Sequence, residues 1–447
     1  MSAPTPVTAR RDLTRTLRQG DLVLVVIGTV IGSGIWLVPG TVLRNTAGDP
    51  GVALLVWLGG GICSLLGALT FAELGALYPD AGGSYTYVRE AFGRFPAFLL
   101  GWTLFLAINT GSTATLAVAF ATYAGELVSL GPVGGKLLPV LMIVAVSAVN
   151  IRGVRHAATV QNWSTAVKVA AILAIAVAGL ALGSGGPESS ARAFATPLSP
   201  GLLSGAGVAL LGVLWAYEGW INVTNSAGEA LDPQRTFARG IIIGTAALVA
   251  LYLLANIGYL AALGPGGVAR SQRVAADTVR ALFGPVPAKL VSAAVLISVF
   301  SAANGLALTG PRMYFAMARD GVFFRALGQV HPRFGTPAMA IAVGGAWAAL
   351  LTLWGSFEQL LTYVVFASWL FAALAAASVF VLRRRRPDAP RPFRVPGYPV
   401  TPAVFILAAV AIVANTVVAR PVQALAGVGI VLLGTPAYLF WRHRAAA

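Results

Sequence analysis

Charged residues are scarce in this sequence of 447 residues: Asp, Glu, Lys and Arg together make up 10% of it. A soluble globular domain carries about 25% charged residues, whereas 57% of this chain is hydrophobic. Such a chain cannot cover a surface that faces water, which excludes a soluble enzyme and a disordered scaffold. The 51 glycines and 26 prolines fit the remaining class, a polytopic membrane protein, because both residues are commoner in membrane helices than in soluble ones.

Cysteine and histidine are also rare. The single Cys63 can form no internal disulfide, which excludes a disulfide framework. His156, His331 and His443 all lie outside the long apolar runs, and the sequence has neither metal-ligand spacing nor a Walker pattern for phosphates. We therefore expect no metal and no cofactor. We also expect no enzyme activity, because no nucleophile and base fall at one predicted membrane depth.

Acidic residues are half as frequent as basic ones, 15 against 31, which gives a formal net charge of +16. Most of the cations fall on alternate loops that include the N-terminus, and the loop 264–290 is the exception. This is the positive-inside pattern, so the excess indicates topology and attraction to lipid headgroups rather than binding to nucleic acid. We predict a plasma-membrane protein whose terminal segments, 1–20 and 442–447, are both cytoplasmic.

Long apolar runs predict the transmembrane helices, since a spanning helix needs about 20 mostly apolar residues. The sequence predicts an all-α integral membrane protein with about twelve spans, near 21–44, 51–78, 93–128, 135–151, 157–182, 201–231, 236–263, 284–317, 336–354, 357–382, 400–419 and 421–441. The basic run Arg383–Arg386 indicates a stop signal that closes the tenth span, with binding of anionic lipid as the alternative.

Two of these spans carry glycines and polar residues at their centres. The first contains Gly28 and the run Gly32–Gly34, and the sixth contains Glu218 and Gly219 followed by several polar residues. Interrupted helices at matching positions of two halves point to a transporter site at the membrane midplane. We therefore predict two five-helix repeats, near 21–182 and 201–382, followed by two helices over 400–441. Close helix packing through small residues is the alternative.

A broken membrane helix persists only where its freed backbone groups line a polar cavity. The half-helix after Ser33 would offer N–H groups and a positive dipole end to a carboxylate, and the half-helix that ends near Tyr217 would offer carbonyls to an ammonium. Gly32 and Gly34 would let a ligand touch the backbone, because they lack a Cβ atom. A site that accepts both charges suits a zwitterion, and an α-amino acid is the obvious candidate.

Lys168 is predicted to lie in the middle of the fifth span. Arg155 marks the end of that span about three turns away, which is too far for the ammonium to snorkel. A charge at that depth is costly, so we expect a function: the ammonium could occupy the place of a bound cation, or titrate. Ser301 on the eighth span, together with Ser298 and Asn304, could meet Lys168. Hydrogen bonding between helices explains these polar residues equally well.

Glu218 is the other deep charge, and three roles are open to it. It could contact a ligand amine, pair with a cation such as Lys168, or cap the second half-helix as a hydrated carboxylate. Trp215 adjoins the break and could gate the site. Glu73 lies near a predicted helix end, where we expect it to be solvated.

Several motifs resemble those of the amino acid–polyamine–organocation superfamily. The run Val30–Trp36 is similar to its GSGIF signature, and Trp215–Trp220 with Gly228–Arg235 is similar to the sixth-helix pattern FAYxGW…EExxNPxR of its L-type amino acid transporter branch. Further matches occur across nearly the whole chain, at Phe120–Tyr123, Asn304–Arg312, Ala318–Gly321, His331–Pro332 and Gly434–Tyr438.

The resemblance implies the LeuT-type 5+5 inverted-repeat fold with discontinuous helices 1 and 6. By position, it implies that Val30, Ser33 and Gly34 line the carboxylate side of the site, that Trp215 is the gating aromatic and that Glu218 lies beside the amine. It also implies that Lys168 stands near the site that sodium fills in sodium-coupled relatives.

The loop 129–136 has no cysteine, so the disulfide that animal members make to a heavy-chain partner is not expected. The sequence thus predicts a bacterial-type, sodium-independent exchanger of neutral L-amino acids that works by alternating access. A proton-coupled symporter is the alternative, with Lys168 or Glu218 as the titrating group, and a transport-inactive nutrient sensor is a second.

Overall fold

The computed structural model describes the chain except residues 1–12, 14, 80–81, 355–356, 420 and 447. The described part is helical and contains no strand. The α-helices are α1 (Gln19–Val30), α2 (Gly34–Asn45), α3 (Pro50–Leu77), α4 (Ser84–Phe92), α5 (Arg94–Thr103), α6 (Asn109–Leu127), α7 (Pro132–Ile151), α8 (Val154–Leu182), α9 (Gly186–Arg192), α10 (Pro200–Tyr217), α11 (Pro233–Arg270), α12 (Val274–Phe283), α13 (Pro285–Thr309), α14 (Pro311–Arg319), α15 (Ala338–Trp354), α16 (Phe357–Arg385), α17 (Val400–Ala419) and α18 (Pro421–Ala446).

Three further segments depart from α-helical geometry. They are a π-helix, η1 (Leu104–Ile108), which joins α5 to α6, and two 3-10 helices, η2 (Trp220–Glu229) and η3 (Arg325–Gly328).

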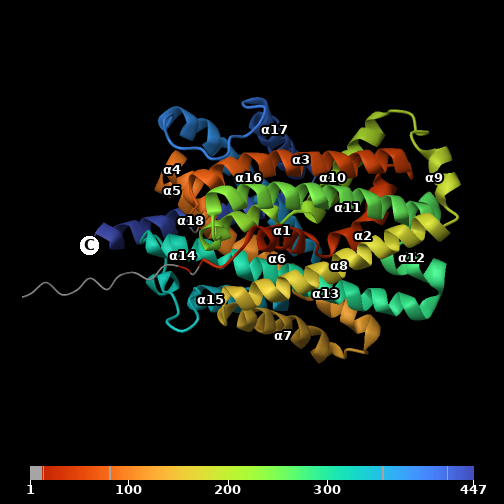
Figure 1. Cartoon of the computed structure of the whole chain (residues 1–447), viewed down its shortest axis with the longest axis horizontal. Helices are drawn as coiled ribbons and strands as arrows, with labels where there is room; N and C mark the ends of the chain where they lie inside the picture. Colours follow the sequence, from red (N-terminus) through yellow and green to blue (C-terminus); the bar gives the residue numbers. More distant parts are fainter. Residues whose placement is uncertain (1–12, 14, 80–81, 355–356, 420, 447) are drawn as a thin grey trace, which may run out of the picture.

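Membrane-length helices form one bundle whose helices run mainly along its long axis (Figure 1). Among the described residues, ten helical segments are long and apolar enough to cross a membrane, and α1 with α2 makes an eleventh that is bent by 48°. The shorter apolar helix α15 occupies the position predicted for the ninth span. The prediction of an all-α membrane protein is confirmed, and a helix lies at each of the twelve predicted positions.

Proline and glycine set the helix boundaries. Many spans begin with proline at the first helical position, where its missing N–H group is not needed, as at Pro50, Pro200 and Pro285. Gly264, with a φ of 66°, interrupts α11 at the place where the sequence predicts the seventh span to end. The remainder of α11 and the separate helix α12 occupy most of the loop that the sequence predicts between the seventh and eighth spans.

The two ends of the bundle are distinguished by the helices that lie there. α18 ends on the same side as α4 and α14, at the left of Figure 1, whereas α9 and α12 lie at the opposite end. The backbone N–H groups of Thr16 and Leu17 donate to the carbonyl of Glu229, whose carboxylate pairs with Arg312 of α14. The start of α1 is thereby fixed to the left end, which we call the α14 end.

Candidate functional site

Both predicted helix breaks are present, and they lie against each other. α1 ends at Val30 and α2 begins at Gly34. α10 ends at Tyr217, and Gly219 then adopts a φ of 127°, a conformation that L side chains rarely adopt. A Cβ atom on Gly219 would lie 3.1 Å from the carbonyl oxygen of Thr29 and 3.2 Å from Cα of Val30. The second half of the sixth span differs from the prediction, because it is the 3-10 helix η2 rather than an α-helix.

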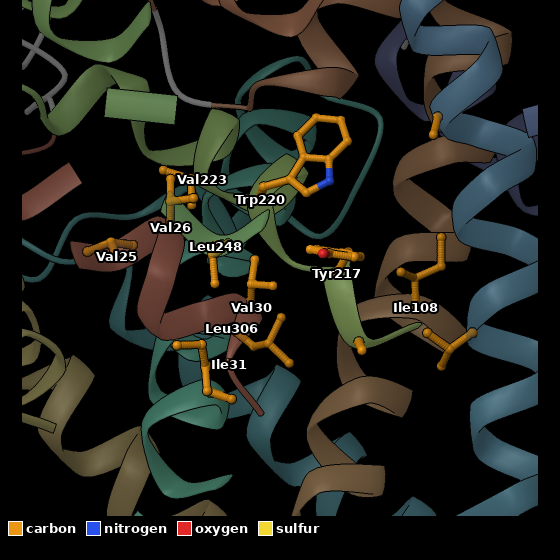
Figure 2. Packing of buried hydrophobic residues seen from close by; sticks show 14 of the residues in the cluster. Val25, Val26, Val30, Ile31, Ile108, Tyr217, Trp220, Val223, Leu248 and Leu306 are labelled. Carbon is orange, nitrogen blue, oxygen red and sulfur yellow. The ribbon is translucent and has the colours of Figure 1, made fainter. Parts of the chain in front are cut away.

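A cavity of about 380 Å³ lies between the two breaks. Six of the seven residues predicted to bind substrate line it, namely Val30, Gly32, Ser33, Gly34, Trp215 and Glu218. Its other lining residues are Thr29, Ser112, Leu116, Gly219, Asn222, Ala302 and Leu306. Helices α6 and α13 thus also contribute to the wall of this cavity. The sequence analysis predicted substrate-binding residues on the first and sixth spans alone. Figure 2 shows the apolar packing around the end of α1, which includes Val30 and Leu306.

Tyr217 does not line this cavity, so its predicted place at the substrate site is corrected. Its side chain is 1% exposed and its ring meets those of Trp57 and Tyr252, at centroid distances of 5.9 and 5.0 Å. The end of α10 is rotated so that Tyr217 packs toward α3 and α11, whereas Glu218, the next residue, faces the cavity.

The backbone groups at the breaks are only partly free. α2 starts at Gly34, so the N–H groups of its first turn have no partner within the helix, although that of Trp36 donates to Ser33 O at 3.2 Å. The carbonyls at the end of α10 were predicted to be free, but Trp215 O accepts from the N–H of Glu218 and Ala216 O accepts from the hydroxyl of Tyr252. The Glu218 carboxylate is therefore the negative group that this side of the cavity offers to a ligand.

The two glycines of the first break differ in what they permit. A Cβ atom on Gly34 would collide with Ala216 of α10, so this glycine is needed for close packing of α2 on α10. A Cβ atom on Gly32 would meet Leu116 Cδ2 at 3.3 Å and Ala302 Cβ at 3.4 Å, on the cavity wall. The missing Cβ of Gly32 thus leaves room in the cavity, and the missing Cβ of Gly34 lets its two sides come together.

Lys168 is fully buried beside the first break. Its Nζ donates to the carbonyl oxygens of Gly28 at 2.6 Å and Ile31 at 2.7 Å, and lies 3.5 Å from Ser298 O. The ammonium thus bridges the last turn of α1 to α8 and α13. Its nearest polar neighbours are backbone carbonyls, and no ion pair to Glu218 is found among the described residues.

Ser298, rather than Ser301, links α13 to this break. The Ser298 hydroxyl lies within donating distance of the carbonyls of Gly32 (2.9 Å) and Ile31 (3.1 Å), and it accepts from the indole N–H of Trp36 at 3.1 Å. Ser301 is buried, but its hydroxyl has no hydrogen-bond partner in the part of the chain that the structure describes. Its predicted contact with Lys168 is therefore corrected.

A buried amide network that the sequence did not reveal lies next to Lys168. Asn304 Nδ2 donates to Gln161 Oε1 at 2.9 Å, and Asn150 Nδ2 donates to Asn304 Oδ1 at 2.9 Å. Gln161 in turn lies against Gly28, whose carbonyl Lys168 binds. Asn304 was recognised as a polar residue on the eighth span, but its two side-chain partners lie on other helices and carry no local signal.

A second cavity, of about 390 Å³, adjoins the first and leads toward the α14 end. Glu218 and Asn222 line both cavities. The second cavity is also lined by Ser84 of α4, Met313 of α14 and residues of α16. The Glu218 carboxylate therefore stands between the helix breaks and one end of the bundle.

Ion pairs at the α14 end correct the prediction for Glu73 and add a role for the basic run Arg383–Arg386. Glu73 is 1% exposed rather than solvated, and its carboxylate accepts from Arg383 at 2.6 and 2.8 Å and from the backbone N–H of Val395 at 2.7 Å. Arg385 and Arg386 contact Ala91 and Glu90 at the end of α4. The basic run Arg383–Arg386 therefore also fixes α16 to α3 and α4, in addition to its predicted role in closing the span.

A bundle of membrane-length helices with two interrupted spans around a polar cavity defines a membrane transporter. Residues 17–434 match the profile of the family described as amino acid permease, and the chain belongs to this family. It is a transport protein rather than an enzyme.

Three relatives agree with this assignment. The chain is 32% identical to the serine/threonine exchanger SteT of Bacillus subtilis, over 95% of this chain and 96% of that protein. It is 32% identical to the mouse b(0,+)-type amino acid transporter 1, over 89% and 82% of the two chains. It is also 32% identical to the human large neutral amino acids transporter small subunit 2, over 94% and 79%.

Proposed function

We propose that this permease exchanges neutral L-amino acids across the membrane by alternating access. The observation that carries the proposal is the cavity between the two helix breaks, with the first turn of α2 on one side and Glu218 on the other. Free N–H groups at a helix start suit a carboxylate, and a carboxylate side chain suits an ammonium. The names of the relatives, which include an exchanger of serine and threonine, support exchange of neutral amino acids.

We propose in addition that transport needs no sodium. The Lys168 ammonium donates to the Gly28 and Ile31 carbonyls at the end of α1. Backbone carbonyls at an interrupted membrane helix are the groups that coordinate sodium in transporters of this architecture. Because Lys168 Nζ already binds these carbonyls, a sodium ion has no vacant place there.

The same proposal includes the arrangement of the helices in two repeats, their orientation in the membrane and the absence of a heavy chain. The helices within 21–182 and 201–382 would form two inverted repeats, with Lys168 in the first and Ser298 in the second. The α14 end, which carries basic loops, would face the cytoplasm together with both termini, in a cell whose plasma membrane holds the protein. Cys63 lies in α3 and the loop 129–136 has no cysteine, so the proposed exchanger works without a disulfide-linked heavy chain.

The test is trans-stimulated uptake by the purified protein in liposomes that are preloaded with single neutral amino acids. The proposal expects uptake of labelled amino acid that depends on internal amino acid and is the same with and without external sodium. Uptake that needs sodium, or no uptake with any internal neutral amino acid, would contradict it.

A proton-coupled symporter is the second candidate, because the Glu218 carboxylate lines both cavities and could bind a proton on the pathway. A pH gradient would then drive net uptake into empty liposomes. Binding of amino acid without any flux would instead indicate a nutrient sensor.

A further inference from the structure

The third predicted span contains a π-turn that neither the family nor the proposed mechanism explains. In η1, the backbone N–H of Asn109 donates to Leu104 O, five residues earlier, where an α-helix would bond four residues earlier. Single π-turns are rare and recur at functional sites. The π-turn of η1 separates two parts of the same span. The part before it, in α5 and η1, faces the second cavity, and the part after it, in α6, faces the first cavity.

Two side chains satisfy carbonyls in this wide turn. The Thr110 hydroxyl donates to Phe105 O, also five residues earlier, at 2.6 Å. The indole N–H of Trp347 on α15 donates to Leu106 O at 3.1 Å. A carbonyl that loses its helical partner in an apolar interior is costly unless another donor reaches it. Thr110 and Trp347 thus stabilise the π-turn against reversion to an α-turn.

The π-turn aligns residues on two cavities. Leu104 and Ile108 line the second cavity, and Ser112 and Leu116 line the first. In an uninterrupted α-helix, three steps of four residues would turn Leu116 about 120° away from the face of Leu104. One extra residue in the wide turn removes about 100° of this rotation, so that Leu104 and Leu116 share one face to within about 20°, and Ser112 and Ile108 lie about 20° and 60° from Leu104 on the other side.

The end of this face that carries Leu116 contacts the first helix break directly. Leu116 Cδ2 lies 3.3 Å from the position of a Cβ atom on Gly32, and both residues line the first cavity. The register of this helix therefore decides which side chain closes the cavity beside the break. A rotation of about 100° would replace Leu116 with a neighbour of different size and polarity, such as Thr115.

We propose that η1 is a specificity-determining element: Thr110 and Trp347 hold the π-turn, which presents Leu104, Ile108, Ser112 and Leu116 together to the transported molecule. Thr110 and Trp347 act as positioning residues, since neither lines the cavities. The specificity role rests on the proposed amino acid transport. The role of Thr110 and Trp347 in holding the π-turn does not, and it can be tested without transport.

The variant Thr110→Val, Trp347→Phe removes both donors and keeps side-chain volume and aromatic packing. Its matched control is Thr103→Val, Trp102→Phe. Thr103 donates to Leu99 O, an ordinary four-residue spacing, and the Trp102 indole donates to Ile430 O at 3.1 Å. Both residues directly precede η1, but their acceptors lie outside it, so the control removes the same bond types without freeing a carbonyl of η1.

The first readout is helix register, measured in a Cys63→Ser background with Leu104→Cys or Leu116→Cys and a small water-soluble thiol reagent. With the π-turn intact, both cysteines react from the cavities. In the Thr110/Trp347 variant, one of the two loses its reactivity because they no longer share a face, whereas in the control both stay reactive. Unchanged reactivity of both cysteines in the Thr110/Trp347 variant overturns the proposal.

The second readout is the ratio of the apparent KM values for L-leucine and L-serine in exchange. We expect this ratio to change at least about threefold in the Thr110/Trp347 variant and to stay within about twofold in the control, because a change of one cavity side chain alters discrimination between side chains by about 10-fold or more. An unchanged ratio overturns the specificity role. If the unmodified protein exchanges no amino acid, the proposed function fails, while the thiol measurement still tests the π-turn.

Discussion

The Nζ atom of Lys168 donates to the carbonyl oxygen of Gly28 at 2.6 Å, across the interface between α8 and the last turn of α1. A second bond to Ile31 O, at 2.7 Å, reaches the break itself. A fixed ammonium therefore holds the end of α1 in the conformation that forms the wall of the cavity. This contact joins the predicted site to the fold.

Replacing Lys168 with Met should abolish exchange, with a loss of at least about tenfold, while the protein still inserts into the membrane. Met keeps the volume of the stem but donates no hydrogen bond, so the two carbonyls lose their partner at about 1–3 kcal/mol each. Exchange in proteoliposomes measures the loss, and Lys289→Met, at an exposed lysine, is the control. Full activity of Lys168→Met would reject the role of the ammonium.

Gly219→Ala should reduce turnover strongly, because a Cβ atom at a φ of 127° is strained and would also press on Thr29 and Val30 of the other break. Gly207→Ala is the matched control, since it lies in the same span with no atom near its Cβ position. Initial exchange rates, normalised to protein in the liposomes, give the comparison. Equal rates for the two variants would show that contact between the breaks is unimportant for transport.

Trp215→Ala should change the range of accepted substrates, since Trp215 is a half-buried aromatic on the wall of the first cavity. Removal of the indole enlarges the cavity, and we expect bulky amino acids to compete better relative to small ones. Inhibition of labelled uptake by a panel of unlabelled amino acids measures the profile. Trp220→Phe serves as the control, because Trp220 packs against Phe71 and Phe405 instead. A profile that matches the unmodified protein would argue against a gate at Trp215.

We predict that Asp49, at the end of the bundle opposite α14, makes a pH-dependent contribution to the stability of the folded state. Burial raises the pKa of Asp49, but hydrogen bonds from the backbone N–H groups of Thr196, Val52 and Phe194 outweigh it, and the pKa lies below its ordinary value of 3.8. A lowered pKa stabilises the folded state above about pH 4, and this stabilisation is lost as the pH falls through the lowered pKa.

Asp49→Asn should accordingly lower the Tm in detergent at pH 7, and its difference from the unmodified protein should shrink as the pH falls from about 4 to 3. Asp388→Asn, at an exposed aspartate, should show no such difference. A deficit for Asp49→Asn that stays constant down to pH 3 would mean that the carboxylate charge contributes nothing.

The sequence predicted the spans and the breaks well, because both follow from local chemistry. The bilayer fixes the length of an apolar run, and a cluster such as Gly32–Gly34 disfavours an unbroken helix. Contacts between distant segments were not predictable. Glu73 and Arg383 lie 310 residues apart, and the acceptors of Lys168 are backbone carbonyls, which carry no signal in the sequence.

Side-chain direction at a break was equally hard to predict. Tyr217 and Glu218 are neighbours, yet one packs on Trp57 and the other lines the cavity, since the rotation of the last turn of α10 depends on helices far away in the sequence. The π-turn at Leu104–Ile108 has no motif of its own, and one of its two donors, Trp347, comes from α15.

The most direct test of the account is competition for binding of a labelled neutral amino acid to the purified protein in sodium-free buffer. The competitors are the same amino acid unmodified, its methyl ester, which lacks the carboxylate, and its N-acetyl derivative, which lacks the ammonium. The account predicts that both derivatives compete at least about 100-fold more weakly, because each leaves one buried polar partner in the site unpaired. If either derivative competed as well as the parent amino acid, the two helix breaks would not bind a zwitterion.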